Sequence, residues 1–426
     1  MLTAVSRYGA RVHPTTQQIV AACRERGEFI RGPQVAAFEQ AFAARLGANH
    51  AIGASYGRTA FYFILEALQL PRGSEIILPA LTFWVVPEMA RAAGLRVRFV
   101  DVDPATFCLD PAALERAITE KTRAVVPTHL FGLPCDMDAI LDLAARHHLA
   151  VIEDCAHALG ATYRGRQVGT FGDGALFSFQ TLTPLNCYGG GMAVVRDAPV
   201  AARVRARIDS LPWPHEKRIA NRLLAGRLLR VFTRPRVFTF VGFPLYWIGS
   251  VLGAQPDACL REKVRPLRPL PDDYLERFSN VQAALGLASL DLLDGWTAAT
   301  RSHAHALSVA LGGIPGVQVP AEPAKRTHVY YQYCVEVPKR AQLVRSCMRR
   351  GVDVEMRHVD VCPQLDLFAA ERIPAPGAER AARAVQVPVH ASLTDRQMRR
   401  VTGVVRKALE AAGPPGRPHV TEAAQP

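Results

Sequence analysis

The feature that most constrains the fold is an alternation of helical and strand patterns from residue 33 to 209. Apolar side chains at Val35, Phe38, Phe42 and Leu46 recur at steps of three and four, which predicts an amphipathic helix. Short apolar runs typical of buried strands follow at 75–79, 97–100, 124–127, 150–152, 175–179 and 192–195. This alternation predicts an α/β fold in which helices cover both faces of a mostly parallel sheet.

A second, smaller α/β unit is expected after the first. Residues 273–311 have a helical pattern, strand patterns return at 329–337 and 352–357, and 395–412 predicts a long amphipathic helix. We therefore divide the chain into an N-terminal arm, a large domain, a basic and apolar insert, a small C-terminal domain and a disordered tail, at 1–32, 33–210, 211–270, 271–412 and 413–426. With 426 residues, 49% of them hydrophobic, wholesale disorder is excluded.

Most of the positive charge lies in one stretch. Of the formal net charge of +13, residues 201–270 hold +10, from fourteen Lys/Arg against four Asp/Glu. Within this stretch, 218–236 predicts a basic amphipathic helix, and 237–256 carries no charge but is interrupted by Pro244 and glycines. The combination is typical of an in-plane anchor at a membrane surface, and a buried hairpin or subunit contact is an equally good interpretation. Nucleic acid is not expected as a partner, because the aromatic residues are not interleaved with the basic ones.

Cysteine usage and the N-terminus indicate a cytoplasmic chain, which the insert would hold at the inner face of a membrane. The nine cysteines are scattered, without a CxxC pair or a Cys/His spacing typical of zinc sites, so we expect reduced thiols and no metal. The first fourteen residues lack a continuous apolar segment, so no signal peptide is predicted.

Three short segments carry residues suited to chemistry. An apolar strand ends in Glu153 and Asp154, with His157 following; a carboxylate there can pair with a cofactor's ring nitrogen, although capping the next helix is the commoner role. Ser178 lies on a short strand ahead of a triple-glycine turn, where a hydroxyl can bind phosphate. Gly57 begins a predicted helix, whose N–H groups form an anion site or, equally, a plain N-cap.

Taken together and in this order, these segments resemble the DegT/StrS family of sugar aminotransferases, which use pyridoxal phosphate (PLP) and have fold type I. The resemblance runs from about Gly27 through the C-terminal helix and is interrupted by the insert. The motifs that carry it are GEFIRGPQVAAFEQAFAARLG, EIILPALTFW, FVDVDPATF, VVPTHLFGLPCDMDAI, VIEDCAHALGA, VGTFGDGALFSF and HVYYQYCVEV. It implies a fold type I large domain with a small C-terminal α/β domain.

The resemblance also implies roles for single residues. Asp154 stands where the family's carboxylate pairs with the pyridine nitrogen, Phe83 where an aromatic stacks on the ring, and His157 where a residue lies against the cofactor. Ser178 and Gly57 stand at positions that bind the cofactor phosphate. The implied cofactor is PLP or its amine form, pyridoxamine phosphate (PMP).

Other positions depart from the family pattern. The family's Ser-Gly-Thr loop is Tyr56-Gly57-Arg58 here, and the Asn that the neighbouring subunit supplies is replaced by Leu275. Arg58 adds positive charge at the phosphate loop and can stand in for the lost Asn contact. The decisive departure is Thr183, at the position of the lysine that forms the Schiff base. A threonine hydroxyl forms no imine and is a poor base near neutral pH.

Whether the chain is an enzyme therefore stays open at this point. In one hypothesis it is a non-catalytic or partner-dependent homologue, in a homodimer or with a competent chain, and it binds a nucleotide sugar or lipid-linked sugar near the membrane. In the other it is an active aminotransferase or dehydratase-like enzyme that holds PLP or PMP without a covalent bond, with His157 or a substrate group moving protons in place of Thr183. Absorbance of bound cofactor would distinguish the two.

Overall fold

The structure is a computed structural model that describes residues 3–251, 262–354 and 359–411. The predicted tail at 413–426, the end of the uncharged run at 252–256 and part of the predicted strand at 352–357 lie outside the described residues.

A seven-stranded sheet forms the centre of the large domain, in the order β1-β10-β9-β6-β5-β2-β4. Its strands are β1 (His50–Ala54), β2 (Glu75–Pro79), β4 (Arg96–Val100), β5 (Thr122–Val125), β6 (Ala150–Asp154), β9 (Gly174–Ser178) and β10 (Gly191–Val195). Strands β9, β6, β5, β2 and β4 pair in parallel, and β10 runs antiparallel to both of its neighbours. The predicted mostly parallel sheet is confirmed; β1 is the strand that the sequence patterns did not predict.

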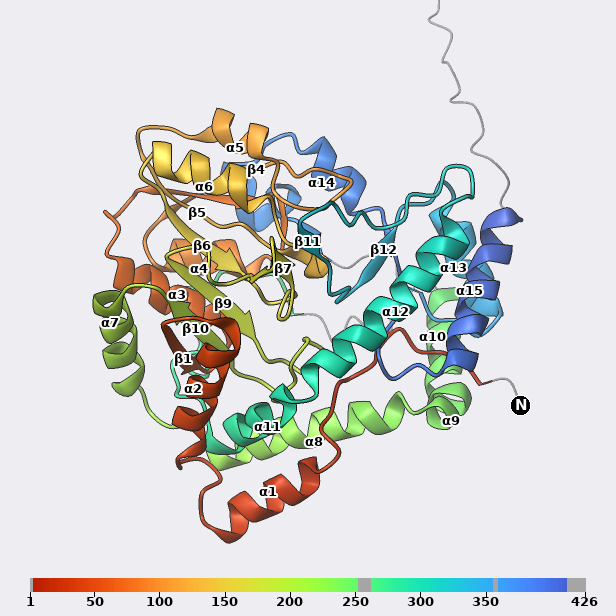
Figure 1. The fold of residues 1–426 in the computed structure, drawn as a ribbon, viewed down its shortest axis with the longest axis horizontal. Coiled ribbons are helices and arrows are strands. Elements are labelled where there is room, and N and C mark those ends of the chain that lie inside the picture. The colour runs from red at the N-terminus through yellow and green to blue at the C-terminus, as the bar shows by residue number, and fades with distance from the viewer. Residues whose placement is uncertain (1–2, 252–261, 355–358, 412–426) are drawn as a thin grey trace, which may run out of the picture.

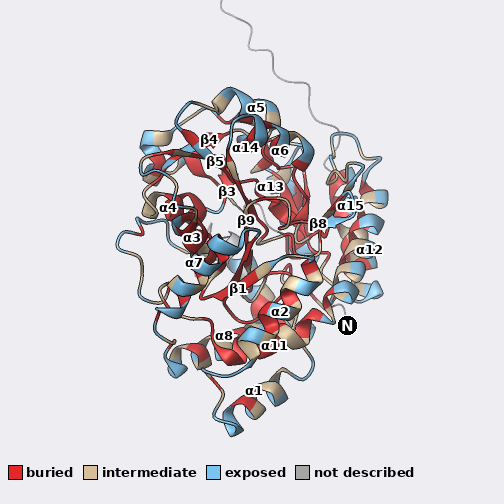
Figure 2. Cartoon of the chain, turned by 60° about the vertical axis from the view of Figure 1, so that its left-hand side comes forward, coloured by how far each residue is buried: buried red, intermediate tan, exposed pale blue. Residues whose placement is uncertain are grey.

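Helices cover both faces of this sheet, as Figures 1 and 2 show. They are α2 (Gln34–Leu46), α3 (Gly57–Leu68), α4 (Val85–Ala92), α5 (Pro111–Ala117), α6 (Met137–Arg146), α7 (Ala198–Asp209) and α11 (Asn280–Leu290). Alternate strand residues point to opposite sides, so Ile152 packs in the same cluster as α3, α4 and α7, whereas its neighbour Val151 packs with α5 and α6. Helices α2 and α11 bury Phe38 and Ala283 on that second face.

The small C-terminal unit has its own apolar cluster. It is built from α12 (Leu293–Leu311), β12 (Tyr333–Val335), α13 (Arg340–Arg349), β14 (Val385–Val387) and α15 (Asp395–Glu410). The two strands pair antiparallel. Val5 of the N-terminal arm bridges to Val352 and buries its side chain in this cluster, so the arm belongs to the small unit's core. The predicted strand at 329–337 is shorter than expected, because Tyr330 has a positive φ of 48° that breaks the extended backbone before it.

The remaining short elements connect these layers. They are α1 (Thr16–Glu25), β3 (Leu81–Thr82), η1 (Leu130–Gly132), β7 (Thr162–Tyr163), β8 (Arg166–Gln167), β11 (Arg326–Thr327), β13 (Asp360–Val361), η4 (Cys362–Gln364), η5 (Asp366–Glu371) and α14 (Pro376–Ala381). Two strand pairings connect the C-terminal part of the chain to the large domain: β13 pairs with β3, and β11 pairs with β7.

The insert is helical and lies along the molecule rather than apart from it (Figure 1). It comprises α8 (Glu216–Phe232), α9 (Pro235–Val237), η2 (Phe238–Gly242) and α10 (Phe243–Val251). Ile219 is buried with α1 and α11, and Phe238 is buried against Ala4 and Met348. One side of the insert is therefore part of the folded chain. In the described part of the chain, none of the helices has both the length and the apolar content needed to cross a membrane.

Gly226 is the point at which α8 approaches the glycine turn after β9. A Cβ atom on Gly226 would lie 2.2 Å from the ring of the buried Tyr188. We expect Gly226→Ala to destabilise the protein by about 1–3 kcal/mol, because overpacking outweighs the gain of up to about 1 kcal/mol in helix propensity.

The matched control is Gly295→Ala in α12, where the added Cβ meets no atom within 4 Å. That change should raise the free energy of unfolding by about 0.5–1 kcal/mol. Both values can be measured by urea denaturation. A Gly226→Ala protein as stable as the Gly295→Ala protein would show that α8 does not pack against Tyr188.

Candidate functional site

The predicted site residues meet at one edge of the sheet, at the carboxyl ends of β6 and β9. Asp154 ends β6 and pairs with Leu176 of β9, and Ser178 ends β9. Gly57 begins α3 against this edge, since a Cβ on it would lie 2.8 Å from the carbonyl oxygen of Phe177 and 3.2 Å from the Cα of Ser178. The structure therefore places the expected carboxylate, hydroxyl and helix N-terminus together, where ligands of parallel sheets bind.

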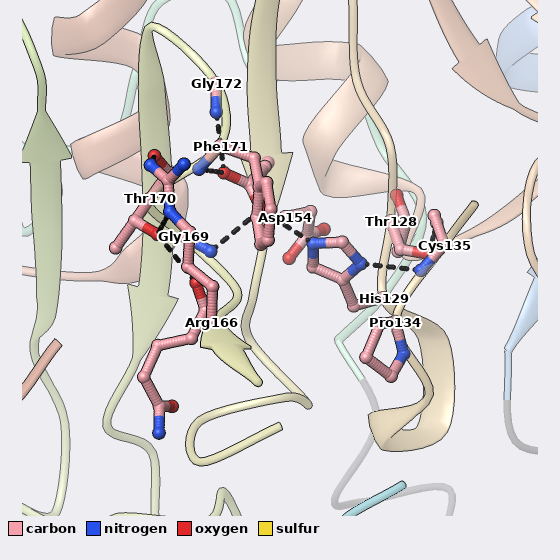
Figure 3. A network of polar contacts seen from close by, with 12 residues as sticks. Thr128, His129, Pro134, Cys135, Asp154, Arg166, Gly169, Thr170, Phe171 and Gly172 are labelled. Atoms are coloured by element: carbon pink, nitrogen blue, oxygen red, sulfur yellow. Dashed lines mark hydrogen bonds and ion pairs between the residues drawn. The ribbon is translucent and has the colours of Figure 1, made fainter. Parts of the chain in front are cut away.

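Glu153 fixes the end of β6 through four hydrogen bonds. Its carboxylate accepts from the backbone N–H groups of Gly169, Phe171 and Gly172, at 2.7–2.9 Å, and lies 3.0 Å from Nε2 of His129 (Figure 3). Burial alone raises the pKa of Glu153, but these donors bring it below its ordinary value, so the group stays ionised. This pair was not predicted, because no local sequence pattern links residues 24 positions apart.

His129 donates from Nε2 to Glu153 in this arrangement. Its Nδ1 accepts a hydrogen bond of 3.0 Å from the Cys135 backbone N–H, which leaves the proton on Nε2. The thiol of Cys155 lies within 4.8 Å of the His129 and Glu153 ligand atoms, and burial raises its pKa well above the ordinary value. Because His129 and Glu153 already bond to each other and to the backbone, we interpret this cluster as a structural network.

Asp154 is buried beside this network and has few partners. Its carboxylate accepts one hydrogen bond of 3.0 Å from the Ala156 N–H, and among the described residues no other side chain or backbone group donates to it. Burial raises its pKa to about 6, and the Ala156 N–H and His129 oppose that rise only in part. A buried carboxylate without a cation suits a ligand that brings a protonated ring nitrogen.

His157 lies between two aromatic rings. Its ring stacks on Tyr331 with centroids 4.1 Å apart, and on Phe131 at 6.3 Å. Burial lowers the pKa of His157 to about 4, so it is neutral at physiological pH. A group with so low a pKa is a weak general base. The stacking was not visible in the sequence, although Tyr331 belongs to one of the motifs that carry the family resemblance.

Phe83 is exposed over 38% of its surface, but a cation already lies over its ring. The Arg58 guanidinium carbon is 5.3 Å from the Phe83 ring centroid and 5.2 Å from that of Tyr274. Arg58 also forms an ion pair with Glu262 and donates to the Tyr274 hydroxyl at 2.6 Å. Its charge, which we expected to serve a cofactor phosphate, is thus engaged by the chain's own acid.

A second set of contacts covers the same loop. Tyr56 bonds through its hydroxyl to the carboxylate of Asp273 and to the guanidinium of Arg222, and Arg222 lies 3.3 Å from Asp273. Arg222 comes from α8 of the insert. The start of α3 is therefore held by side chains of the insert and of the segment that follows it. Ser178 keeps a hydroxyl without a hydrogen bond to any described residue.

Thr183 is buried in the turn between β9 and β10. Its hydroxyl lies 2.8 Å from the carbonyl oxygen of Gln180 and 2.9 Å from that of Leu185, so its one proton is taken by two backbone acceptors. The side chain therefore has a local role in closing the turn. The chain's six lysines are all exposed, at 121, 217, 263, 325, 339 and 407. Lys217 is the closest of them to Thr183 in sequence, and Lys263 directly follows Glu262, the partner of Arg58.

A cavity borders the Thr183 turn, with Arg11, Leu182, Pro184, Tyr331 and Gln386 in its wall. Arg11 donates to the Pro184 carbonyl at 3.2 Å, and burial lowers its pKa to about 10. It has no acidic partner among the described residues, and the buried Oε1 atom of Gln386 has no hydrogen-bond donor there. A partly buried cation without an acid suits an anionic ligand group. No sequence pattern indicated a role for Arg11, which lies 173 positions from Pro184.

The residues described above fit the pyridine ring and the phosphate of PLP or PMP. The under-bonded Asp154 carboxylate suits the ring nitrogen, and the unpaired Ser178 hydroxyl and the α3 N-terminus at Gly57 suit a phosphate. They do not fit a covalent attachment, because Thr183 supplies no amine and the lysines are exposed. The site is thus suited to holding such a group without a bond to the chain.

The chain belongs to the DegT/DnrJ/EryC1/StrS aminotransferase family. The family model matches residues 11–212 and 273–406, and so leaves out 213–272, which include α8, α9, η2 and α10. The fold is that of the family's PLP-dependent fold type I structures, as the resemblance implied.

Two relatives and one solved structure illustrate what the chain is similar to. It is 31% identical over 401 residues to the "Pleiotropic regulatory protein" of Geobacillus stearothermophilus, covering 92% of this chain and 93% of the relative. It is also 31% identical to the GDP-perosamine synthase of Caulobacter vibrioides, over 89% of this chain and 91% of that one. The crystal structure of S. venezuelae DesV in complex with a ketimine intermediate matches with 29% identity and a TM-score of 0.73, over 93% and 94% of the two chains.

We expect Asp154→Asn to stabilise the protein at pH 8. The folded-state pKa of about 6 exceeds the ordinary value of 3.8, so the unpaired charge costs stability as the pH rises through 6, by about 3 kcal/mol when fully ionised. At pH 4 the carboxyl is protonated in the folded state and only partly ionised in the unfolded state, so the variant should gain little. Thermal unfolding at pH 4 and pH 8 measures the difference.

The control is Asp136→Asn, which removes an acceptor of Tyr163 and Arg326 and should lower stability at both pH values. If Asp154→Asn behaves in the same way, Asp154 is a paired structural carboxylate and its place in a ligand site is wrong.

Proposed function

We propose that this chain is a lysine-free member of the sugar aminotransferase family that acts in amino-sugar or glycan biosynthesis as a non-catalytic or partner-dependent subunit. The observation that carries the proposal is Thr183, whose hydroxyl is bound to two backbone carbonyls where the family places its lysine. A residue used in this way neither forms an imine nor shuttles a proton. The family membership and the GDP-perosamine synthase relative support the biosynthetic setting and a nucleotide sugar as ligand.

The proposed cofactor is PLP or PMP, held without a covalent bond. Asp154 would hold the proton of its ring nitrogen, Phe83 would face the ring, and Ser178 with Gly57 would bind its phosphate. When bound, such a group supplies an electron-withdrawing ring next to the sugar site. Arg11 would contribute positive charge for an anionic group of the ligand at the edge of the same site. An active enzyme in which His157 acts as the base is the weaker alternative, because burial lowers the pKa of His157 to about 4.

The proposed partners are a nucleotide sugar or lipid-linked sugar and a second subunit. The family resemblance implies a site completed across a dimer interface, which allows either a homodimer or a pair with a lysine-containing homologue. The proposed setting is the cytoplasm, near the inner face of a membrane. The eight free, buried cysteines among the described residues support a reducing compartment.

We expect the wild-type protein to form no lysine adduct with PLP. Incubation with PLP, reduction with borohydride and peptide mapping should label none of the six lysines stoichiometrically. Thr183→Lys should gain one labelled lysine, at residue 183, together with visible absorbance. The substitution gives up one buried hydroxyl hydrogen bond, worth about 1 kcal/mol, so the variant should still fold.

Asp154→Asn in the Thr183→Lys background is the control, and it should weaken PLP binding without removing the new amine. Stoichiometric labelling of a native lysine, with Lys263 as the first to examine, would falsify the lysine-free assignment. A folded Thr183→Lys protein that acquires no label would contradict the retained pocket.

A further inference from the structure

Exposed apolar side chains are concentrated on the insert. In the described part of the chain eleven large hydrophobic residues are exposed, and eight of them lie between residues 224 and 248. They are Leu224, Leu228 and Val231 of α8 and Phe240, Val241, Leu245, Trp247 and Ile248 of η2 and α10. Scattered apolar residues on a surface are ordinary, but such a concentration marks an interaction site. We call these eight residues, with the arginines described below, the basic apolar face.

The spacing of these residues shows that the insert is apolar on two sides. Leu224, Leu228 and Val231 recur at steps of four and three along α8, so they lie on one stripe of the helix. The opposite side of the insert is occupied by residues that pack into the protein, among them the buried Ile219 and Phe238. A helix whose only task is to cover a core has a polar outer surface, so the second apolar stripe calls for another partner.

Four arginines accompany this stripe: Arg227, Arg230, Arg234 and Arg236. All four are exposed, and none forms an ion pair with an acid among the described residues. Earlier on the same helix, Arg218 pairs with Glu276 and Arg222 with Asp273. The inner arginines are therefore neutralised and the outer ones are not. No Asp or Glu occurs in the sequence from 217 to 256, so the partner must bring the negative charge.

We propose that the basic apolar face binds the surface of an anionic lipid membrane, with α8 and α10 lying in its plane. Apolar side chains enter the boundary between headgroups and acyl chains, and the arginines meet the lipid phosphates. Trp247, exposed over 44% of its surface, is the type of residue that prefers this boundary. The mode is in-plane, in line with the absence of a spanning helix among the described residues. The inference is independent of whether the site at Asp154 is catalytic.

A second copy of the chain fits this face less well. A two-fold contact would set the same patch against itself, so the unpaired arginines of one copy would face those of the other. A nucleic acid also fits less well, because six of the eight exposed apolar residues are aliphatic and offer no ring for base stacking. Of these three partners, only an anionic membrane complements both the positive charge and the apolar side chains of the basic apolar face.

The test is co-sedimentation of the full chain with phosphatidylcholine vesicles, with and without phosphatidylglycerol. We expect binding only to the vesicles that contain phosphatidylglycerol, weakened by salt. A triple variant, Arg227→Ser, Arg234→Ser and Arg236→Ser, should bind at least tenfold more weakly, since each arginine near an anionic surface contributes about a fivefold factor. A second variant, Leu228→Ser, Leu245→Ser and Trp247→Ser, keeps the charge and should also lose binding.

The matched control removes three exposed, unpaired arginines from the far side of the molecule, near α5 and β4: Arg72→Ser, Arg96→Ser and Arg116→Ser. This control variant should bind as tightly as the wild type, which would show that binding depends on the basic apolar face and not on the net charge of the protein. Tryptophan emission should shift to shorter wavelength on binding, and Trp247→Phe should lose that shift. All of these residues are exposed, so circular dichroism should be unchanged.

Three results would overturn the proposal. The first is a wild-type protein that does not bind vesicles containing phosphatidylglycerol. The second is equal loss of binding in the control and in the arginine variant, which would reduce the effect to net charge. The third is a change of sedimentation from dimer to monomer in the apolar variant without vesicle binding by the wild type, which would make the face a subunit interface.

Discussion

The buried carboxylate of Glu153 is the interaction on which the site edge depends. It accepts hydrogen bonds from N–H groups of the 169–172 loop and from the His129 ring, and so fixes the end of β6. The next residue, Asp154, is then held in the strand by backbone bonds, with its N–H on the Pro127 carbonyl and its carbonyl on the His129 N–H. Because its position is fixed by its neighbours, its own carboxylate is left under-bonded, which is the arrangement expected where a ligand completes the pairing.

The loop at the start of α3 is held by polar contacts from other parts of the chain. Arg58 and Tyr56 are bound by groups that the insert and its following segment supply, namely Arg222, Glu262 and Asp273. Removing one partner from such a half-buried ion pair leaves an uncompensated charge, so the members of this group depend on one another. The insert is thereby part of the wall of the candidate site.

The sequence predicted what depends on local pattern. Buried strands such as 75–79 and 192–195 are predicted correctly because strands of a sheet covered on both faces are continuously apolar. Strand β1 was missed because three of the five residues of His50–Ala54 are Ala or Gly, which carry no such signal. The partner of Arg58 was missed for a different reason: Glu262 is 204 positions away, and only the folded chain brings an ion pair of that separation together. Likewise, the pattern of 218–236 indicated a basic amphipathic helix but not which of its arginines face inward.

That last distinction explains how one segment carries so much charge without destabilising the fold. Arg205, Arg218 and Arg222 each pair with an acid from another part of the chain, so their positive charge is compensated in the folded state. The exposed arginines at 227, 230, 234 and 236 lie at the surface, where water and salt screen their mutual repulsion. The two halves of α8 therefore have different roles. The first half carries the paired arginines and closes the wall around Tyr56. The second half carries unpaired arginines next to exposed apolar side chains.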